Sequence, residues 1–255
     1  MVYNNKTEIQ PQTISTDSAG SNFVNFALLK LIGREFAPCF KRINNKATMF
    51  AGFDKPSKYK HYFLRPSSQI KEQLIIDEWD NIKRIMASLV LKNTTQSILV
   101  RKLCGTARKD KTKEALWEYD KIIRSNYLFR YIDNEDLRTS VRTALNRTEA
   151  FHQLKKSIAS VNSDSLTGGD DDDIALNDQC TRLLCLVVIY YNSYILSEVL
   201  KAKSEKASDK DLEAFKHISL ISWSHINFHG YYNFSSGFSE DALKEMIQSI
   251  LLDHE

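Results

Sequence analysis

The chain has 255 residues, of which 42% are hydrophobic and 26% are charged, and it contains only 8 Gly and 4 Pro. These globular proportions exclude a collagenous, low-complexity or disordered protein, and the length suits one large domain or two small ones. The net charge of +3 conceals an asymmetry, because residues 41–113 hold 17 Lys and Arg against 6 Asp and Glu, a net +11. The remainder holds 18 against 26, a net −8.

The first expected elements place an acidic residue at the end of a strand. Residues 8–17 have the isoleucines, threonines and early Pro of a short strand, and apolar residues at helical spacing between residue 21 and Gly33 predict a helix after it. Asp17 is therefore expected at the carboxyl end of the strand, the edge at which ligands bind in open α/β sheets. The alternative is that Asp17 caps the helix, a role that Ser21 or Asn22 could fill equally well.

The rest of the chain is predicted to be mostly helical. Residues 41–68 form a basic, poorly periodic connection with a short extended piece at 62–64. Apolar residues then recur at helical spacing over 75–89, 116–127, 133–161, 211–221 and 241–252. Residues 174–200 are apolar on most sides and predict a largely buried helix, whereas the acidic residues 162–173 predict a solvated loop.

Cysteine usage and hydropathy indicate a cytoplasmic protein. The four cysteines form no CxxC pair, which favours reduced thiols over a disulfide framework or a zinc site. The longest apolar run, residues 183–191, is far shorter than the roughly 20 residues that a spanning helix needs. We therefore expect no membrane segment.

The predicted helix over 133–161 carries a second candidate carboxylate. At about 100° per residue, Glu149 shares one flank of this helix with Arg138, Arg142 and Lys156. One interpretation is a salt-bridged surface, and the other is a metal-binding carboxylate beside cations that hold phosphates. Asp17 and Glu149 would be two of the three carboxylates that a two-metal phosphoryl-transfer site normally needs.

Short blocks of sequence resemble the large replicative transposases of the Tn-three type, which are DDE recombinases with an RNase H-like catalytic domain. The blocks occur in family order over nearly the whole chain. They are Ser15-Thr16-Asp17-Ser18-Ala19-Gly20, Val24-Asn25-Phe26-Ala27-Leu28-Leu29, Phe36-Ala37-Pro38, Leu99-Val100-Arg101-Lys102-Leu103, Leu145-Asn146-Arg147-Thr148-Glu149-Ala150, Asn177-Asp178-Gln179-Cys180-Thr181-Arg182-Leu183 and Trp223-Ser224-His225-Ile226-Asn227-Phe228-His229-Gly230-Tyr231-Tyr232.

The resemblance implies that Asp17 is the second catalytic carboxylate and Glu149 the third, together holding two Mg²⁺ ions. The first catalytic Asp of the family lies upstream of anything present here, so this chain looks like the C-terminal part of a transposase and is expected to be inactive alone. The implied fold is mainly α with a few strands, the C-terminal portion of an RNase H-like α/β catalytic domain carrying a helical insertion. Its expected parts are residues 1–40 from the core, 41–132 as the basic helical insertion, 133–161 as the helix with the catalytic Glu, and 162–255 as a helical C-terminal region.

The basic insertion is expected to contact double-stranded DNA, both transposon ends and target, through its phosphates. Arg101 and Lys102 are the first candidates, with the cluster at 108–113, and Arg142 and Lys156 are further candidates on the helix of Glu149. The parent enzyme is expected to be a homodimer. Two alternatives remain: the charges form only a solvated surface, or the chain is a non-catalytic helical module that binds DNA or a protein partner.

Overall fold

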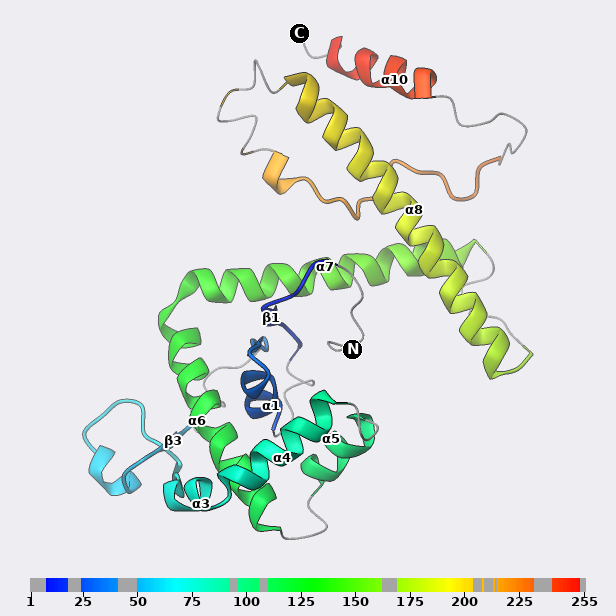
Figure 1. Ribbon diagram of the computed structural model, residues 1–255. Coiled ribbons are helices and arrows are strands. Elements are labelled where there is room, and N and C mark those ends of the chain that lie inside the picture. Colours follow the sequence, from blue (N-terminus) through cyan, green and yellow to red (C-terminus); the bar gives the residue numbers. More distant parts are fainter. Residues whose placement is uncertain are drawn as a thin grey trace. The chain divides into compact units, whose positions relative to one another are not determined.

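The computed structural model describes residues 8–17, 24–40, 50–91, 96–105, 110–161, 169–203, 208, 213, 215–231 and 240–252. The chain divides into two compact units, Met1–Leu145 and Asn146–Glu255, and each is described by itself. Most described residues are helical (Figure 1), which confirms the expected mainly α class. The boundaries expected after residues 40, 132 and 161 stay predictions.

The first unit begins with two parallel strands joined through a helix. Strands β1 (Thr13–Ile14) and β2 (Glu35–Phe36) flank helix α1 (Asn25–Leu31). Backbone hydrogen bonds extend the pairing beyond the strands, from Glu35 N to Gln12 O at 2.8 Å and from Cys39 N to Thr16 O at 2.8 Å. The helix ends at Leu31, and Gly33, two residues later, has a φ of 75° that an L side chain rarely adopts. The predicted order of strand and helix is confirmed, with a shorter strand than expected.

Helix α1 is capped by a carboxylate from a distant helix. Its N-cap residue, Val24, makes no side-chain capping bond. Instead, the backbone N–H of Ala27 donates to Asp120 Oδ1 at 3.0 Å, and Asp120 belongs to helix α6 (Lys111–Asp133). Asp120 is fully buried and forms an ion pair with Arg124 one turn later. Burial raises the pKa of Asp120, while Arg124 and the backbone amides of α1 act against that increase.

Helix α6 is the element on which the rest of the first unit packs (Figure 1). Leu116 lies in one buried cluster with residues of α1 and of helix α4 (Trp79–Val90), and Tyr127 lies in a second cluster with aromatic residues that follow α1. The Tyr127 hydroxyl also donates to Pro38 O at 2.8 Å. At the other end of α6, Trp117 Nε1 donates to Leu103 O at 3.0 Å, which attaches helix α5 (Gln96–Cys104).

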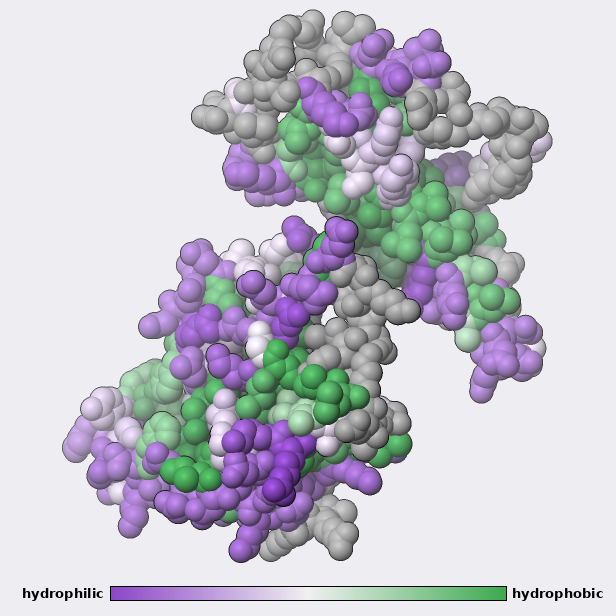
Figure 2. Space-filling model, viewed as in Figure 1, coloured by the Kyte–Doolittle hydropathy of each residue, from purple (hydrophilic) through white to green (hydrophobic). Residues whose placement is uncertain are grey.

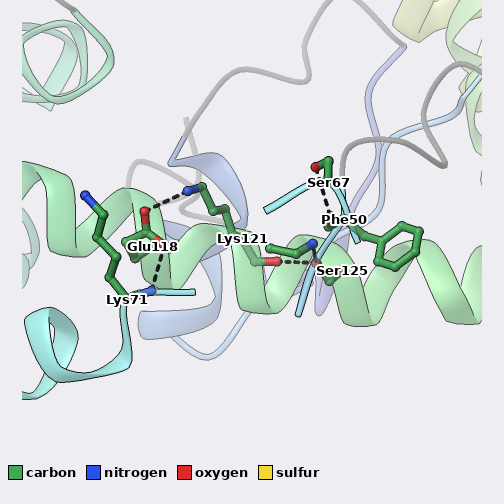
Figure 3. Close-up of polar contacts among 7 residues, drawn as sticks. Phe50, Ser67, Lys71, Glu118, Lys121 and Ser125 are labelled. Carbon is green, nitrogen blue, oxygen red and sulfur yellow. Dashed lines mark hydrogen bonds and ion pairs between the residues drawn. The ribbon is translucent and has the colours of Figure 1, made fainter. Parts of the chain in front are cut away.

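Residues 50–71 form a lobe whose two ends are attached to α6. Strands β3 (Ala51–Gly52) and β4 (Ser68–Gln69) pair in parallel, the 3₁₀ helix η4 (Pro56–Tyr59) lies between them, and helix α3 (Glu72–Asp77) follows. Ala51 N donates to Ser125 Oγ at 2.9 Å, and Lys71 N donates to Glu118 Oε2 at 3.1 Å (Figure 3). The expected extended piece at 62–64 is wrong, because those residues form bends and the pairing lies at the ends of the lobe. Residues 41–49 lie outside the described part.

The second unit is built on helices α7 (Glu135–Ser160), which begins in the first unit, and α8 (Asp171–Lys203). Leu154 and Ile158 of α7 pack against Cys185 and Val188 of α8. Lys155 forms an ion pair with Asp178 across the same pair of helices. Helix α10 (Glu240–Leu252) contacts α8 and confirms the expected last helix. Of the helix expected over 211–221, residues 213 and 215–217 are helical, and 211, 212 and 214 lie outside the described residues. The expectation is wrong for residues 218–221, which are not helical and end in a turn.

The prediction that residues 174–200 are largely buried is wrong. Six apolar residues on α8 are 53–71% exposed, and Figure 2 shows hydrophobic residues gathered along this helix. They are Leu176, Leu183, Leu184, Leu186, Val187 and Tyr190. By length and composition alone α8 could cross a membrane, but a core helix of a soluble protein passes the same test, so this is weak evidence.

The acidic residues 170–173 lie at the N-terminal end of α8. Asp173 N donates to Asp170 Oδ1 at 2.9 Å, and Asp173 Oδ2 accepts a hydrogen bond from Gly169 N at 3.2 Å. Carboxylates are favourable here because the N-terminal N–H groups of a helix carry partial positive charge. The expectation of a loop is therefore wrong for residues 171–173, which form the first turn of α8 and are exposed to solvent. Residues 162–168 lie outside the described part.

Replacing Asp120 with Ala is expected to destabilise the first unit by about 3–5 kcal/mol, because it leaves the Arg124 charge buried without its carboxylate. It also removes the acceptor that caps α1. Urea unfolding followed by circular dichroism measures the loss. Asp80→Ala is the matched control, since Asp80 forms only an exposed ion pair with Lys83 and its removal should shift the midpoint little. Equal midpoints for both variants would contradict the assignment.

Replacing Asp178 with Asn is expected to lower stability at neutral pH only. The hydrogen bond from Lys155 lowers the pKa of Asp178, helped by the charges of Lys155 and Arg182. A carboxyl group with a lowered pKa stabilises the fold fully above its unfolded-state pKa of about 4, and this contribution is lost as the pH falls through the folded-state pKa. Urea midpoints of the chain and the variant should therefore differ at neutral pH and converge once the pH has fallen below the folded-state pKa of Asp178. A difference that persists undiminished in acid would contradict this account.

Candidate catalytic carboxylates and nucleic-acid interface

The structure places Asp17 directly after the paired segment that contains β1. The last ladder hydrogen bond of this segment is accepted by Thr16 O, and the Asp17 side chain is exposed. The N-cap residue of α1 is Val24, and Asp120 supplies the acceptor for the N–H of Ala27, so the N-cap position and this acceptor both belong to residues other than Asp17. Residues 18–23 lie outside the described part, and Ser21 and Asn22 are among them. Asp17 thus occupies the predicted position at a strand end.

Glu149 lies on the exposed side of α7. Its Oε1 accepts a hydrogen bond from Gln153 Nε2 at 2.7 Å, one helical turn later. Arg138, expected on the same flank, instead donates to Tyr131 O at 2.9 Å and Ile132 O at 2.6 Å and so binds the last carbonyl groups of α6. The Glu149 carboxylate therefore accepts its hydrogen bond from a neutral amide. A metal ion that prefers oxygen ligands can replace this amide.

The two carboxylates belong to different units, Asp17 to the first and Glu149 to the second. Each is an exposed oxygen donor of the kind that Mg²⁺ prefers. Within the described residues, no group of three or more His, Cys, Asp and Glu side chains is arranged to hold a metal ion. Both side chains are carboxylates and so suit a magnesium site. Two carboxylates are too few to hold the ions, so such a site would need further ligands.

The predicted DNA-binding cations occupy exposed positions. Arg101 and Lys102 lie in the last turn of α5, where the neighbouring Leu103 is buried and its carbonyl binds Trp117. This contact fixes the helix end and leaves both cations in solvent. Arg142 and Lys156 are exposed on α7.

The expectation that the whole cluster at 108–113 contacts DNA is wrong for one of its residues. Lys113 is buried, and its Nζ lies over the Trp117 ring at 5.3 Å from the centroid, so its charge is already engaged. Residues 106–109 lie outside the described part. Lys111, at the start of α6, is the exposed cation of this cluster in the described residues.

Exposed aromatic residues lie between the cations of the lobe at 50–71, and they were not predicted from the sequence. Phe53, Tyr62 and Phe63 are 54%, 65% and 100% exposed. Lys60 lies just before Tyr62, and Arg65 follows Phe63 by two residues. Aromatic rings interleaved with cations are typical of surfaces that bind nucleic acid, and this signal was visible in a segment interpreted as an irregular connection.

Comparison with known proteins agrees with the resemblance in the sequence. The family described as "Tn3 transposase DDE domain" matches residues 1–232. The transposase for transposon gamma-delta from Escherichia coli K12 is 28% identical over 97% of this chain and 24% of its own length. The transposase for transposon Tn1546 from Enterococcus faecium is 24% identical over 91% of this chain and 23% of its own length. The transposase for transposon Tn2501 from Escherichia coli is 27% identical over 85% of this chain and 22% of its own length.

No solved structure matches the chain. The chain spans about a quarter of the length of the curated relatives that it matches. Because the family match covers residues 1–232, it includes both Asp17 and Glu149. The chain belongs to the Tn3 transposase DDE-domain family.

Proposed function

We propose that this chain supplies two of the three catalytic carboxylates of a DDE transposase, Asp17 and Glu149. The observation that carries the proposal is the family match over residues 1–232, which includes both positions. The placement of Asp17 at the end of the β1 segment supports it, because ligands gather at that edge of α/β folds. We assign the strands and α1 to an RNase H-like core and the residues that follow to its helical insertion.

In the proposed mechanism, the two side chains act as oxygen ligands. Bound Mg²⁺ would polarise the phosphodiester and activate the attacking water or 3′-hydroxyl. Asp17 and Glu149 would bind these ions together with a third carboxylate from outside residues 1–255. To do so, Glu149 would lose the hydrogen bond that it accepts from Gln153. Lys156 lies two turns after Glu149 on α7 and would hold a phosphate of the cleaved strand.

The same proposal makes double-stranded DNA the partner of the basic segment. Arg101, Lys102, Arg142 and Lys156 are exposed, and each would neutralise a phosphate and release bound counterions. Contacts of this kind position the protein on transposon ends and target without reading their sequence. The complete enzyme would work as a homodimer on DNA in the cytoplasm. Alone, the chain would bind DNA but cleave it poorly, since an incomplete ligand set does not hold the metal ions in place.

Replacing Glu149 with Gln is expected to lower Mg²⁺-dependent strand transfer by about a hundredfold or more, because an amide is a poor metal ligand. The assay joins the chain to the upstream part of a transposase of this family and uses DNA that carries transposon ends. Glu135→Gln, at an exposed acid in the first turn of the same helix, is the matched control and should retain activity. Equal strand transfer by the Glu149→Gln protein and the unchanged protein would favour the non-catalytic DNA-binding module.

Removing the charges of Arg101 and Lys102 is expected to weaken duplex binding and to flatten its salt dependence. The slope of log affinity against log salt should fall by about one for each cation that no longer neutralises a phosphate. Titration of the 255-residue chain with short duplex DNA at several salt concentrations measures the slope. Lys83→Gln is the control, since Lys83 lies in the basic segment but pairs with Asp80 at 2.7 Å. An unchanged slope in the Arg101→Gln, Lys102→Gln protein would exclude these residues from the interface.

A further inference from the structure

The lobe at 50–71 and helix α6 line an open pocket of about 780 Å³ within the first unit. This volume falls within the range of about 300–1,000 Å³ that is usual for sites that bind small molecules or parts of larger ones. Figure 1 shows β3 and the cyan lobe beside α6. Six aromatic side chains line the pocket, and an amide side chain provides a polar group. These residues are Phe50, Phe53, Tyr59, Tyr62, Phe63, Phe129 and Asn126.

Hydrogen bonds at the two ends of the lobe maintain the shape of the pocket. Ser125 and Glu118 of α6 bind its first and last backbone groups (Figure 3), and Ser67 Oγ donates to Phe50 O at 3.1 Å across its base. Gly52 lies so close to the wall that an added Cβ would be 3.1 Å from Pro66 and 3.2 Å from Tyr59. The two ends of the lobe are therefore attached to α6 before any ligand arrives, which lowers the entropic cost of binding.

The exposed aromatic rings of the pocket suit a ligand with a flat apolar face. Phe63 is completely exposed and Tyr62 is 65% exposed, although both line the pocket. Phe50 and Phe129 are in contact at the pocket, with ring centroids 5.0 Å apart, and Tyr59 and Tyr62 are 6.1 Å apart. Asn126 adds a hydrogen-bond donor and an acceptor, the combination with which an amide side chain pairs with the edge of a base.

The charges of the lobe select an anionic ligand. Residues 50–71 contain five Lys and Arg against one Asp, and that Asp, Asp54, is already paired with Lys58 at 2.6 Å. Lys55, Lys60 and Arg65 are exposed. Arg65 is also held in place, because its Nε donates to Tyr62 O at 3.2 Å. A ligand that presents a flat ring to the pocket and a negative charge to these cations satisfies both features, and a nucleotide has this chemistry.

We propose that this pocket binds unpaired nucleobases of a DNA strand, with the phosphates of that strand on the surrounding cations. The proposal rests on the proposed DNA-binding function and adds to it a site for single-stranded nucleotides. Stacking on aromatic rings tolerates any base sequence, since every base has a flat face. Bases taken out of a duplex lose their stacking energy, and a pocket of aromatic rings that stacks them would compensate for that loss.

The test compares two DNA probes on the full 255-residue chain, a blunt duplex and the same duplex with a single-stranded 3′ tail that carries a fluorescent base analogue. Tailed DNA is expected to bind at least about tenfold more tightly than blunt DNA, with quenching of the analogue as it stacks on a ring. The variant Tyr62→Ala, Phe63→Ala should lose the advantage and the quenching, while its affinity for blunt duplex stays unchanged. Because both rings are exposed, the variant should fold normally, as circular dichroism can verify.

The matched control is Ile76→Ala, Leu91→Ala, which removes two exposed apolar side chains outside the pocket, 60% and 68% exposed, and should keep the preference for tailed DNA. Equal affinity of the unchanged chain for both probes overturns the proposal, as does a tail preference that survives in the Tyr62→Ala, Phe63→Ala variant. Failure of the proposed DNA-binding function looks different, because blunt duplex would then not bind in a salt-dependent way. Duplex binding without any tail effect leaves that function intact and points to an apolar partner for the pocket.

Discussion

The arrangement of the first unit depends on one buried carboxylate. Asp120 accepts a hydrogen bond from the backbone of α1 while Arg124 compensates its charge, and neither group tolerates removal of the other in a buried setting. This hydrogen bond fixes where α1 begins relative to α6. Because α1 connects β1 to β2, the same bond sets the position of the paired segment and of Asp17 at its end. A residue far from the candidate chemistry therefore positions one of its carboxylates.

The same principle explains how α6 carries the irregular parts of the first unit. Segments without regular structure leave backbone N–H and C=O groups that need partners when buried. Glu118, Ser125 and Tyr127 supply those partners to three different segments, namely Lys71, Ala51 and Pro38. Loops fixed in this way can display cations and aromatic rings in a constant geometry. A binding surface on a fixed scaffold loses less conformational entropy when DNA arrives.

Sequence patterns predicted the elements better than the contacts between them. The spacing of apolar residues located α4, α6, α7 and α10, and the order of strand, Asp17 and helix was correct. Asp120 could not be recognised, since an acidic residue on an amphipathic helix has the same pattern whether it faces solvent or caps another helix. The exposure of α8 could not be predicted either, because apolar residues on all sides indicate burial only when other elements cover every side. For the candidate site, the sequence located Asp17 and Glu149 within their elements, and the four-residue spacing of Glu149 and Gln153 on the predicted helix could have indicated their hydrogen bond. The binding of Arg138 to the end of α6 has no such signal, because it depends on the angle at which the two helices meet.

Burial divides the acidic residues of this chain into two groups with different roles. Asp120 is buried, ion-paired and bound to backbone, so its carboxylate is committed to stability and is closed to a ligand. Asp17 and Glu149 are exposed, and the hydrogen bond that Glu149 accepts comes from a neutral side chain. Exchanging that bond for a metal ion costs little, since no buried charge is left behind. An exposed carboxylate also gives little preorganisation, so tight metal binding depends on several such ligands being brought together. Under the proposed function, metal binding and assembly of the complete site would therefore be coupled, and DNA cleavage would be restricted to the assembled enzyme.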